Sequence, residues 1–179
     1  MTGPDTNPGT EPRATPVIQP DARLPDTPVP DTPVPAAALP RTRAYGEVAA
    51  GDGLPRLEIP VTRTLIVASA LASRDYQDVH HDPGLAREHG SRDIFMNILT
   101  SNGLVDRYVT GWAGPAAVVK AIRIRLGAPS HPGDTLVLTG TVTARSDADR
   151  TVDIAVEGTN GLGTHVAGTV TVQLPVKAG

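Results

Sequence analysis

The chain has 179 residues, enough for one ordinary domain, and 39% of them are hydrophobic. Sixteen Lys and Arg stand against 19 Asp and Glu, so the formal net charge of −3 offers no basic field to nucleic acid or anionic lipid. The absence of cysteine excludes a disulfide framework, a thiolate metal site and a cysteine nucleophile.

Residues 1–43 differ in composition from the rest of the chain. Prolines recur every few residues, and the unit PDTPV occurs twice in tandem, at 25–29 and 30–34. Each proline fixes its own φ and disfavours helix in the residue before it, so this segment is predicted to be a disordered tail. A docking role for the tail is the alternative. The segment lacks the basic and apolar regions of a secretory signal and is too acidic for a transit peptide, so we expect a cytoplasmic protein.

Residues 44–179 are predicted to form one domain that opens with a strand and a helix. Alternation of apolar and polar residues over 57–61 indicates the strand. Thr64 is expected to cap the helix, which should end near Ser73. One face of this helix carries Leu65, Ala68, Leu71 and Ala72.

Two further helices are expected. A short one should begin at Asp82-Pro83 and end near Gly90, because Asp is a good N-cap and proline is tolerated at the first helical position. The segment 94–109 has the strongest helical pattern of the chain. Gly103 inside it costs about 1 kcal/mol in helix propensity, which suggests close packing against a sheet. The apolar stripe of this helix consists of Ile94, Phe95, Ile98, Leu99, Leu104, Val105, Tyr108 and Val109.

The C-terminal part reads as four strands. Segments rich in Val and Thr, separated by Asp, Gly and Asn turns, fall at 117–126, 135–145, 151–158 and 165–174. The glycine-rich stretch 158–163 is predicted to be a hairpin turn and not a nucleotide-binding loop, because no helix follows it. A strand, helices, one long buried helix and an antiparallel run together predict an α+β domain. In that layout a curved sheet wraps around a central helix, which is the hotdog fold.

The stretch SRDYQDVHHDP, residues 73–83, concentrates the titratable groups. Asp75 and His80 lie in a loop between two predicted helices, where catalytic groups are often found. A carboxyl group and an imidazole can divide the acid and base roles on one water or one substrate. The alternative is that Asp78, His81 and Asp82 cap helix ends and that His80 is a structural loop histidine. Spacing alone leaves both open. A metal site around His81 lacks a distant third ligand, so no metal is expected.

The same stretch carries a family resemblance. Residues 73–80 resemble the signature Ser-Gly-Asp-x-Asn-Pro-aliphatic-His of the MaoC-like, (R)-specific enoyl-CoA hydratases, with Asp75 and His80 on its Asp and His. The Gly, Asn and Pro of the signature are replaced, by Arg74, Gln77 and Asp78. The resemblance covers about 57–174. Over RDYQDVHHD and GSRDIFMNILTSNGLVDRYVTGWAGP the chain is similar to the small MaoC-like subunits of actinobacterial steroid side-chain enoyl-CoA hydratases.

This resemblance implies a reaction and its residues. Water would add across the double bond of a (2E)-enoyl-CoA to give a 3-hydroxyacyl-CoA, with Asp75 and His80 as the catalytic pair and no cofactor. In the family the central helix points its N-terminus at the thioester carbonyl, and free backbone N–H groups there suit a developing oxyanion. The matching segment places that donor at Asn97, where the family has Gly, with Met96 beside it. A steroid, polyketide or fatty acyl group remains open.

The resemblance also bears on the partner of this chain and on the alternative functions. A single hotdog leaves a sheet edge and apolar surface uncovered, so we expect a heteromer with a second MaoC-like hotdog subunit, or else a homodimer. Neither nucleic acid nor a membrane is expected as a partner. The rival functions are a hotdog acyl-CoA thioesterase and a non-catalytic partner subunit.

Five other charged or titratable residues receive predictions without a catalytic role. Arg123 and Arg125 alternate with apolar residues, which indicates a rim or subunit contact, or alternatively a contact to a coenzyme A phosphate. His89 is expected at an exposed helix end. His131, in a Pro-Gly turn, and His165, at a strand start, are expected to be solvated.

Overall fold

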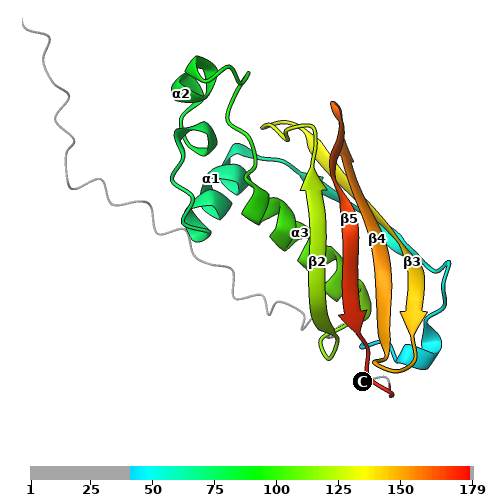
Figure 1. Ribbon diagram of the computed structural model, residues 1–179. Coiled ribbons are helices and arrows are strands. Elements are labelled where there is room, and N and C mark those ends of the chain that lie inside the picture. The colour runs from blue at the N-terminus through cyan, green and yellow to red at the C-terminus, as the bar shows by residue number, and fades with distance from the viewer. Residues whose placement is uncertain (1–40, 178–179) are drawn as a thin grey trace, which may run out of the picture. The chain divides into compact units, whose positions relative to one another are not determined.

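The computed structural model describes residues 41–177, and its central feature is one antiparallel sheet of five strands (Figure 1). The order across the sheet is β1-β3-β4-β5-β2, so β2 pairs with the last strand and the two edges are β1 and β2. The strands are β1 (Gly53–Pro60), β2 (Val118–Leu126), β3 (Thr135–Ser146), β4 (Thr151–Asn160) and β5 (Gly163–Gln173).

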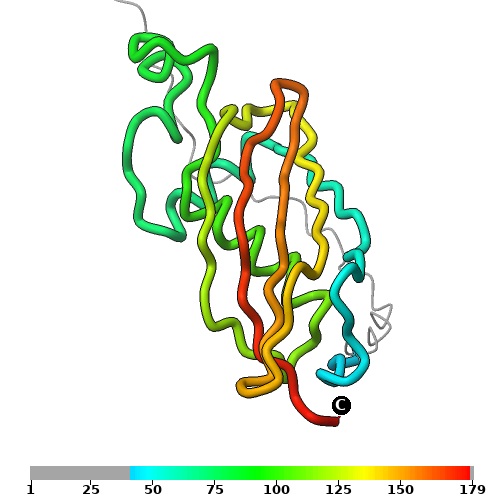
Figure 2. Tube along the Cα trace, turned by 45° about the vertical axis from the view of Figure 1, so that its right-hand side comes forward, coloured from blue at the N-terminus to red at the C-terminus, as the bar shows by residue number. Residues whose placement is uncertain are grey.

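Between residue 41 and β2 the structure has three α-helices and two short 3₁₀ turns. The longest helix, α3, runs along one face of the sheet, and the region of α1 and α2 lies near its N-terminal end (Figures 1 and 2). None of the helices within 41–177 is long and apolar enough to cross a bilayer. The elements are η1 (Tyr45–Glu47), α1 (Arg63–Ala72), η2 (Asp78–His80), α2 (Pro83–Glu88) and α3 (Ile98–Ala113).

The core lies between α3 and the sheet and consists mainly of Val, Leu and Ile, as the scarcity of aromatic residues predicts. Tyr108 packs its ring where β3 has Gly140: a Cβ at that glycine would lie 3.2 Å from the ring. Because β3 has no side chain at this position, α3 can pack close to the sheet. The buried residues from the sheet include Leu136, Leu138, Val142, Val152, Ile154, Val156, Val166, Val170 and Val172.

The predicted layout of a sheet around a central helix is confirmed, but the helix begins later than predicted. It starts at Ile98 and not at 94, because the Asn97 side chain accepts the Thr100 N–H at 2.8 Å and caps it. As a result Ile98 and Leu99, predicted for the apolar stripe, are 53% and 50% exposed. Gly103 has nothing within 4 Å of where a Cβ would lie, so the prediction that it packs against the sheet is wrong.

The orientation of α1 also differs from the prediction. Thr62, not Thr64, is its N-cap and accepts the Leu65 N–H at 3.0 Å. The helix buries Ile66 and Ala70, so the apolar face predicted from the pattern is largely its outer surface. A short apolar helix has two plausible faces, and packing decides which one is covered.

The other local predictions fare better. Asp82 caps α2 with Pro83 in its first turn, and the stretch 158–163 falls at the β4–β5 hairpin. Most of the predicted tail lies outside the described residues. Thr42 and Arg43, which the prediction placed in the tail, already contact the end of α3, because the Arg43 N–H donates to Ala113 O at 2.9 Å.

Candidate active site

The turn after α1 presents Asp75. The chain reverses at Arg74, whose φ of 57° is left-handed, and the Asp75 N–H returns to Ala70 O at 2.9 Å. Glycine is the usual residue for this conformation, and glycine is what the hydratase signature has there. Arg74 therefore adopts, at the cost of some backbone strain, a conformation that a glycine would adopt freely.

His80 is buried and its ring orientation is fixed. Its Nδ1 lies 2.7 Å from Phe95 O, and because a carbonyl can only accept, Nδ1 carries a proton. Nε2 is turned to Asp75 Oδ2, at 3.4 Å. The Phe95 ring packs edge-on against the imidazole, with the ring centres 5.0 Å apart.

Two acceptors facing each other require a donor. In the tautomer with its proton on Nδ1 alone, His80 offers a lone pair at Nε2, as the Asp75 carboxylate does, and 3.4 Å is longer than a good direct hydrogen bond. A water molecule that donates one hydrogen to each would satisfy both groups. The two atoms are thus placed so that one donor between them can reach both.

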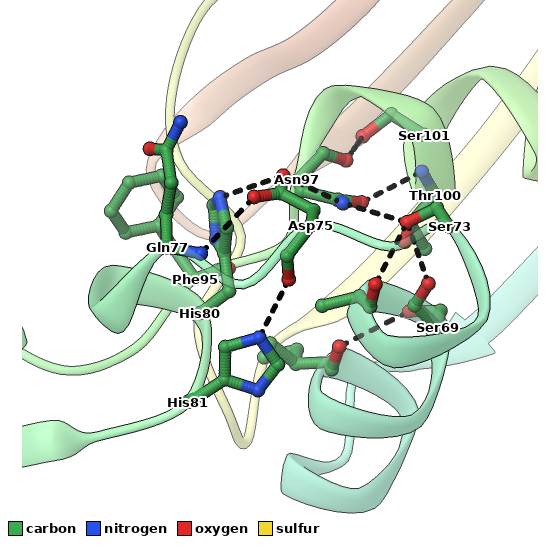
Figure 3. A network of polar contacts seen from close by, with 12 residues as sticks. Ser69, Ser73, Asp75, Gln77, His80, His81, Phe95, Asn97, Thr100 and Ser101 are labelled. Atoms are coloured by element: carbon green, nitrogen blue, oxygen red, sulfur yellow. Dashed lines mark hydrogen bonds and ion pairs between the residues drawn. The ribbon is translucent and has the colours of Figure 1, made fainter.

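Asn97 ties this pair to the start of α3 (Figure 3). Its amide Nδ2 donates to Asp75 Oδ2 at 2.9 Å and to Ser73 Oγ at 3.0 Å, while its Oδ1 caps the helix. The Asn97 amide, with help from the Gln77 N–H, holds the pKa of Asp75 below its usual range. Asp75 is therefore ionised near neutral pH although its side chain is only 18% exposed.

The two residues predicted for the oxyanion site behave differently. The Met96 N–H is occupied, because it donates to Ser130 O at 2.9 Å, and its side chain is buried. The Asn97 N–H has no acceptor within residues 41–177, and it lies at the positive end of the α3 dipole. Of the two, Asn97 alone has an N–H available for a negatively charged oxygen.

His81 supports Asp75 from behind. Its Nε2 lies 2.7 Å from the Asp75 carbonyl and so carries the proton, and the ring faces the backbone of the loop and not the carboxylate (Figure 3). This agrees with the loop-capping interpretation of His81. Asp78 is exposed, and no group of three potential metal ligands occurs in the described part of the chain.

Two histidines predicted to be solvated are buried, and both predictions are wrong. His131 Nδ1 donates to Ile94 O at 2.9 Å, so His80 and His131 hold consecutive carbonyls of the segment that leads into α3. His165 places Nδ1 2.7 Å from Ala128 O and Nε2 2.8 Å from Ser101 Oγ on α3. Burial lowers the pKa of His165, which stays neutral. His131 belongs to the loop after β2 and reaches from it to the segment before α3, and Ala128 of the same loop bonds His165. Strand alternation carries no signal of these contacts.

The remaining predictions concern the surface. His89 is exposed after α2, as predicted. Arg123 and Arg125 are exposed on the edge strand β2 and are absent from the polar network around Asp75. Their assignment to a rim, a subunit contact or a coenzyme A phosphate stays a prediction.

Comparison with known proteins identifies the family. The family described as MaoC like domain matches residues 48–164. The chain is 52% identical over 120 residues to the 3-oxo-4,17-pregnadiene-20-carboxyl-CoA hydratase beta subunit of Mycobacterium tuberculosis, covering 67% of this chain and 92% of that protein.

Solved structures agree with this match. A chain of the ChsH1-ChsH2 complex from M. tuberculosis is 49% identical, with a TM-score of 0.69 over 71% of this chain and 98% of that one. The R-hydratase PhaJ1 from Pseudomonas aeruginosa, at 19% identity, shares the fold, with a TM-score of 0.71 over 77% of this chain and 89% of that one. The chain belongs to the MaoC-like domain family and has its hotdog fold.

Proposed function

We propose that this protein is a subunit of an enoyl-CoA hydratase that adds water to a (2E)-enoyl-CoA and forms a 3-hydroxyacyl-CoA. The observation that carries the proposal is the facing pair of acceptors, His80 Nε2 and Asp75 Oδ2, beside the N-terminus of α3. The similarity to a subunit of a 3-oxo-4,17-pregnadiene-20-carboxyl-CoA hydratase supports a steroid side-chain thioester as the substrate.

The mechanism follows from the positions of these groups. The thioester makes C3 of the enoyl group electrophilic, and the water held by the pair attacks it while His80 Nε2 takes one of the water's protons. The electron pair of the double bond moves through C2 onto the thioester oxygen. The Asn97 N–H and the end of the α3 dipole stabilise that oxygen.

The second half of the reaction completes the addition. C2 takes up a proton relayed from the His80 imidazolium by way of the Asp75 carboxylate, and the carbonyl re-forms. The net change is one hydroxyl on C3 and one hydrogen on C2, with the pair returned to its starting charge. Because one pair serves a single face of the double bond, the hydroxyl and the hydrogen add to that same face.

Two other functions compete with hydration. A thioesterase of this fold would use an acid on the long helix, and the first acid on α3 is Asp106. Asp106 is nine residues beyond Asn97, which places it roughly 13 Å along the helix axis. A non-catalytic partner subunit would leave the Asp75–His80 pair without a function.

The proposal includes a partner. One relative is named a beta subunit and one solved structure is of a complex, which supports a heteromer with a second MaoC-like subunit over a homodimer. Sizing the chain alone at micromolar concentration tests this, and a well-behaved monomer would speak against any obligate assembly. The cytoplasmic location and the independence from a cofactor stay predictions.

One incubation distinguishes the three functions. The complex is mixed with an enoyl-CoA, and both the enoyl thioester absorbance and the free thiol are followed. Loss of absorbance without free thiol indicates a hydratase. Release of thiol indicates a thioesterase. No change in either signal indicates that the complex has neither activity, and whether an active complex uses this subunit is decided by the Asp75 and His80 variants.

A further inference from the structure

The backbone around the Asn97 N–H, the proposed oxyanion donor, is held on both sides. On one side the Met96 N–H donates to Ser130 O at 2.9 Å. On the other side Asn97 O lies 3.2 Å from both the N–H and the hydroxyl oxygen of Ser101, one turn further along α3 (Figure 3). Because peptide groups are planar, these contacts leave the Asn97 N–H few directions in which to point.

Ser101 is joined to the sheet by a buried histidine of β5. Its hydroxyl oxygen lies 2.8 Å from His165 Nε2, and His165 Nδ1 lies 2.7 Å from Ala128 O. A carbonyl can only accept and burial keeps the ring neutral, so Nδ1 carries the proton and the Ser101 hydroxyl donates to Nε2. Ser101 and His165 are each only 1% exposed, so water does not compete for these bonds.

The loop between β2 and β3, which supplies Ala128 O, is held by two strands. The N–H groups of residues 127 and 128 both donate at 2.8 Å to carbonyls at the start of β5. Asn160, at the end of β4, donates its amide to Ser130 Oγ at 2.9 Å and to Pro129 O at 3.0 Å. The loop is therefore fixed to the sheet at several points.

This loop reaches the backbone of Asn97 by two routes. One is the direct bond from the Met96 N–H to Ser130 O. The other runs from the loop through His165 to Ser101. An imidazole loses its hydration on burial, and an apolar side chain would fill the same space without that cost. The direction of the two hydrogen bonds explains the buried polar pair better than packing does.

We propose that His165 and Ser101 are positioning residues that hold the first turn of α3 against the sheet, so that the Asn97 N–H points at the thioester oxygen. The inference rests on the proposed hydration and adds two residues outside the Asp75–His80 pair. An oxyanion donor is effective only in the right geometry, and a misplacement of about 1 Å can cost about 10²-fold in rate. Loss of the His165–Ser101 bond should therefore affect catalysis and not only stability.

Two substitutions in the assembled complex release Ser101 from the sheet. Ser101→Ala removes the hydroxyl. His165→Asn keeps an amide donor for Ala128 O but is too short to reach Ser101. In both variants kcat for enoyl-CoA hydration should fall by roughly tenfold or more, but by less than the roughly 10²- to 10³-fold that loss of an oxyanion donor costs. KM should change by less than about threefold, because the contact is strongest in the transition state.

The thioester carbonyl of a bound ligand reports the position of the donor directly. The probe is the saturated form of the assayed enoyl-CoA, isotope-labelled at the carbonyl, which has no double bond to hydrate. Hydrogen bonding lowers the stretching frequency of a carbonyl. The infrared band of the bound probe should therefore lie below that of the free probe in the wild type and move back toward it in both variants. A purely structural role of the pair would lower the thermal stability and leave this band in place.

Ser101→Thr and Thr110→Val are the matched controls. Ser101→Thr keeps a hydroxyl that can donate to His165, so kcat should stay close to the wild-type value. Thr110 also donates its hydroxyl to the carbonyl four residues before it on α3, Asp106 O at 2.8 Å, but it lies near the other end of the helix. Thr110→Val should change neither kcat nor the carbonyl band.

Three results would overturn the proposal. The first is a carbonyl band that does not move in Ser101→Ala and His165→Asn, whatever happens to kcat. The second is an equal loss of kcat in Ser101→Thr and Ser101→Ala. The third is failure of both Ser101→Ala and His165→Asn to assemble, because the pair would then serve folding alone. If the wild-type complex does not hydrate the enoyl-CoA, the proposed function fails, whereas a band that still moves in the two variants would support the positioning role.

Discussion

The Asn97 amide nitrogen lies 2.9 Å from Asp75 Oδ2, the same carboxylate oxygen that faces His80 Nε2. The residue that caps α3 is thereby part of the proposed catalytic arrangement. The capping oxygen fixes the side chain on the first turn of α3, and the amide nitrogen fixes the carboxylate. The position of Asp75 and the start of the helix that carries the oxyanion donor therefore depend on one residue.

Replacing Asn97 should shift the pH dependence of the reaction. Asn97→Ser retains a capping oxygen and removes the amide donor, so the pKa of Asp75 should rise. Because the carboxylate must be ionised, the acid limb of the kcat/KM profile should move to higher pH. Asn97→Asp, which places a second carboxylate against Asp75, should move it further in the same direction. An acid limb that stays in place in both variants would show that Asn97 does not control Asp75.

The same contact makes a prediction about stability. The folded-state pKa of Asp75 is lowered, so its stabilising contribution is present above the unfolded value of about 3.9 and is lost as pH falls through the folded pKa. Below about pH 4, the free energy of unfolding should therefore fall less steeply with decreasing pH in Asn97→Ser than in the wild type. Denaturant titrations from pH 3 to 6 measure this slope, and an unchanged slope would contradict the assignment.

Two substitutions of Arg74 should change the stability of the protein in opposite directions. Its φ of 57° suits glycine, so Arg74→Gly should change the free energy of unfolding by about 0 to 1 kcal/mol in the stabilising direction and leave activity intact. Arg74→Val places a β-branched residue there and should destabilise by about 1–2 kcal/mol. Arg150, at φ 53° in the turn between β3 and β4, is the control and should respond alike in stability. Equal stability of Arg74→Gly and Arg74→Val would show that the turn is not strained.

The buried His165 should make the fold sensitive to mild acid. Its folded-state pKa is lowered by burial, so below the unfolded value of about 6.5 the unfolded chain binds a proton that the folded chain does not. The free energy of unfolding should fall between pH 7 and pH 5 for this reason. The double variant Ser101→Ala/His165→Leu removes the histidine and its hydroxyl partner together, and its stability should depend less on pH over that interval. A slope equal to that of the wild type would mean that His165 is protonated in the fold.

The sequence and the structure agree where local chemistry is decisive. Asp82-Pro83 starts a helix as its residue types require, and Val/Thr alternation with Gly and Asn turns locates the strands. Asp75 and His80 are five positions apart, and the short η2 turn brings them together as the family signature implies.

Other features depend on contacts between distant segments. His131 and His165 look solvated in a turn and at a strand start, but His131 is buried against Ile94 O, and His165 is buried against Ala128 O of the loop after β2. Asn97 falls inside an apolar run that reads as helix from Ile94 onward. The structure shows that the residues before Asn97 are not helical, because their N–H groups donate to other segments: Phe95 N–H to Val79 O and Met96 N–H to Ser130 O. Asn97 is therefore the cap of α3 and not a residue inside it. Gly103 likewise reads as a packing residue, but it is exposed and nothing lies within 4 Å of the position that a Cβ would take.

The most direct test of the proposed mechanism is the rate of enoyl-CoA hydration by the assembled complex carrying Asp75→Asn or His80→Ala in this subunit. Each change should lower turnover by roughly 10²-fold or more, because the water loses either its orienting carboxylate or its base. His81→Ala, which removes only a bond to the Asp75 backbone carbonyl, should cost less than about tenfold. Near-native rates in Asp75→Asn and His80→Ala would contradict the account, because the catalytic pair would then have to lie on the partner subunit.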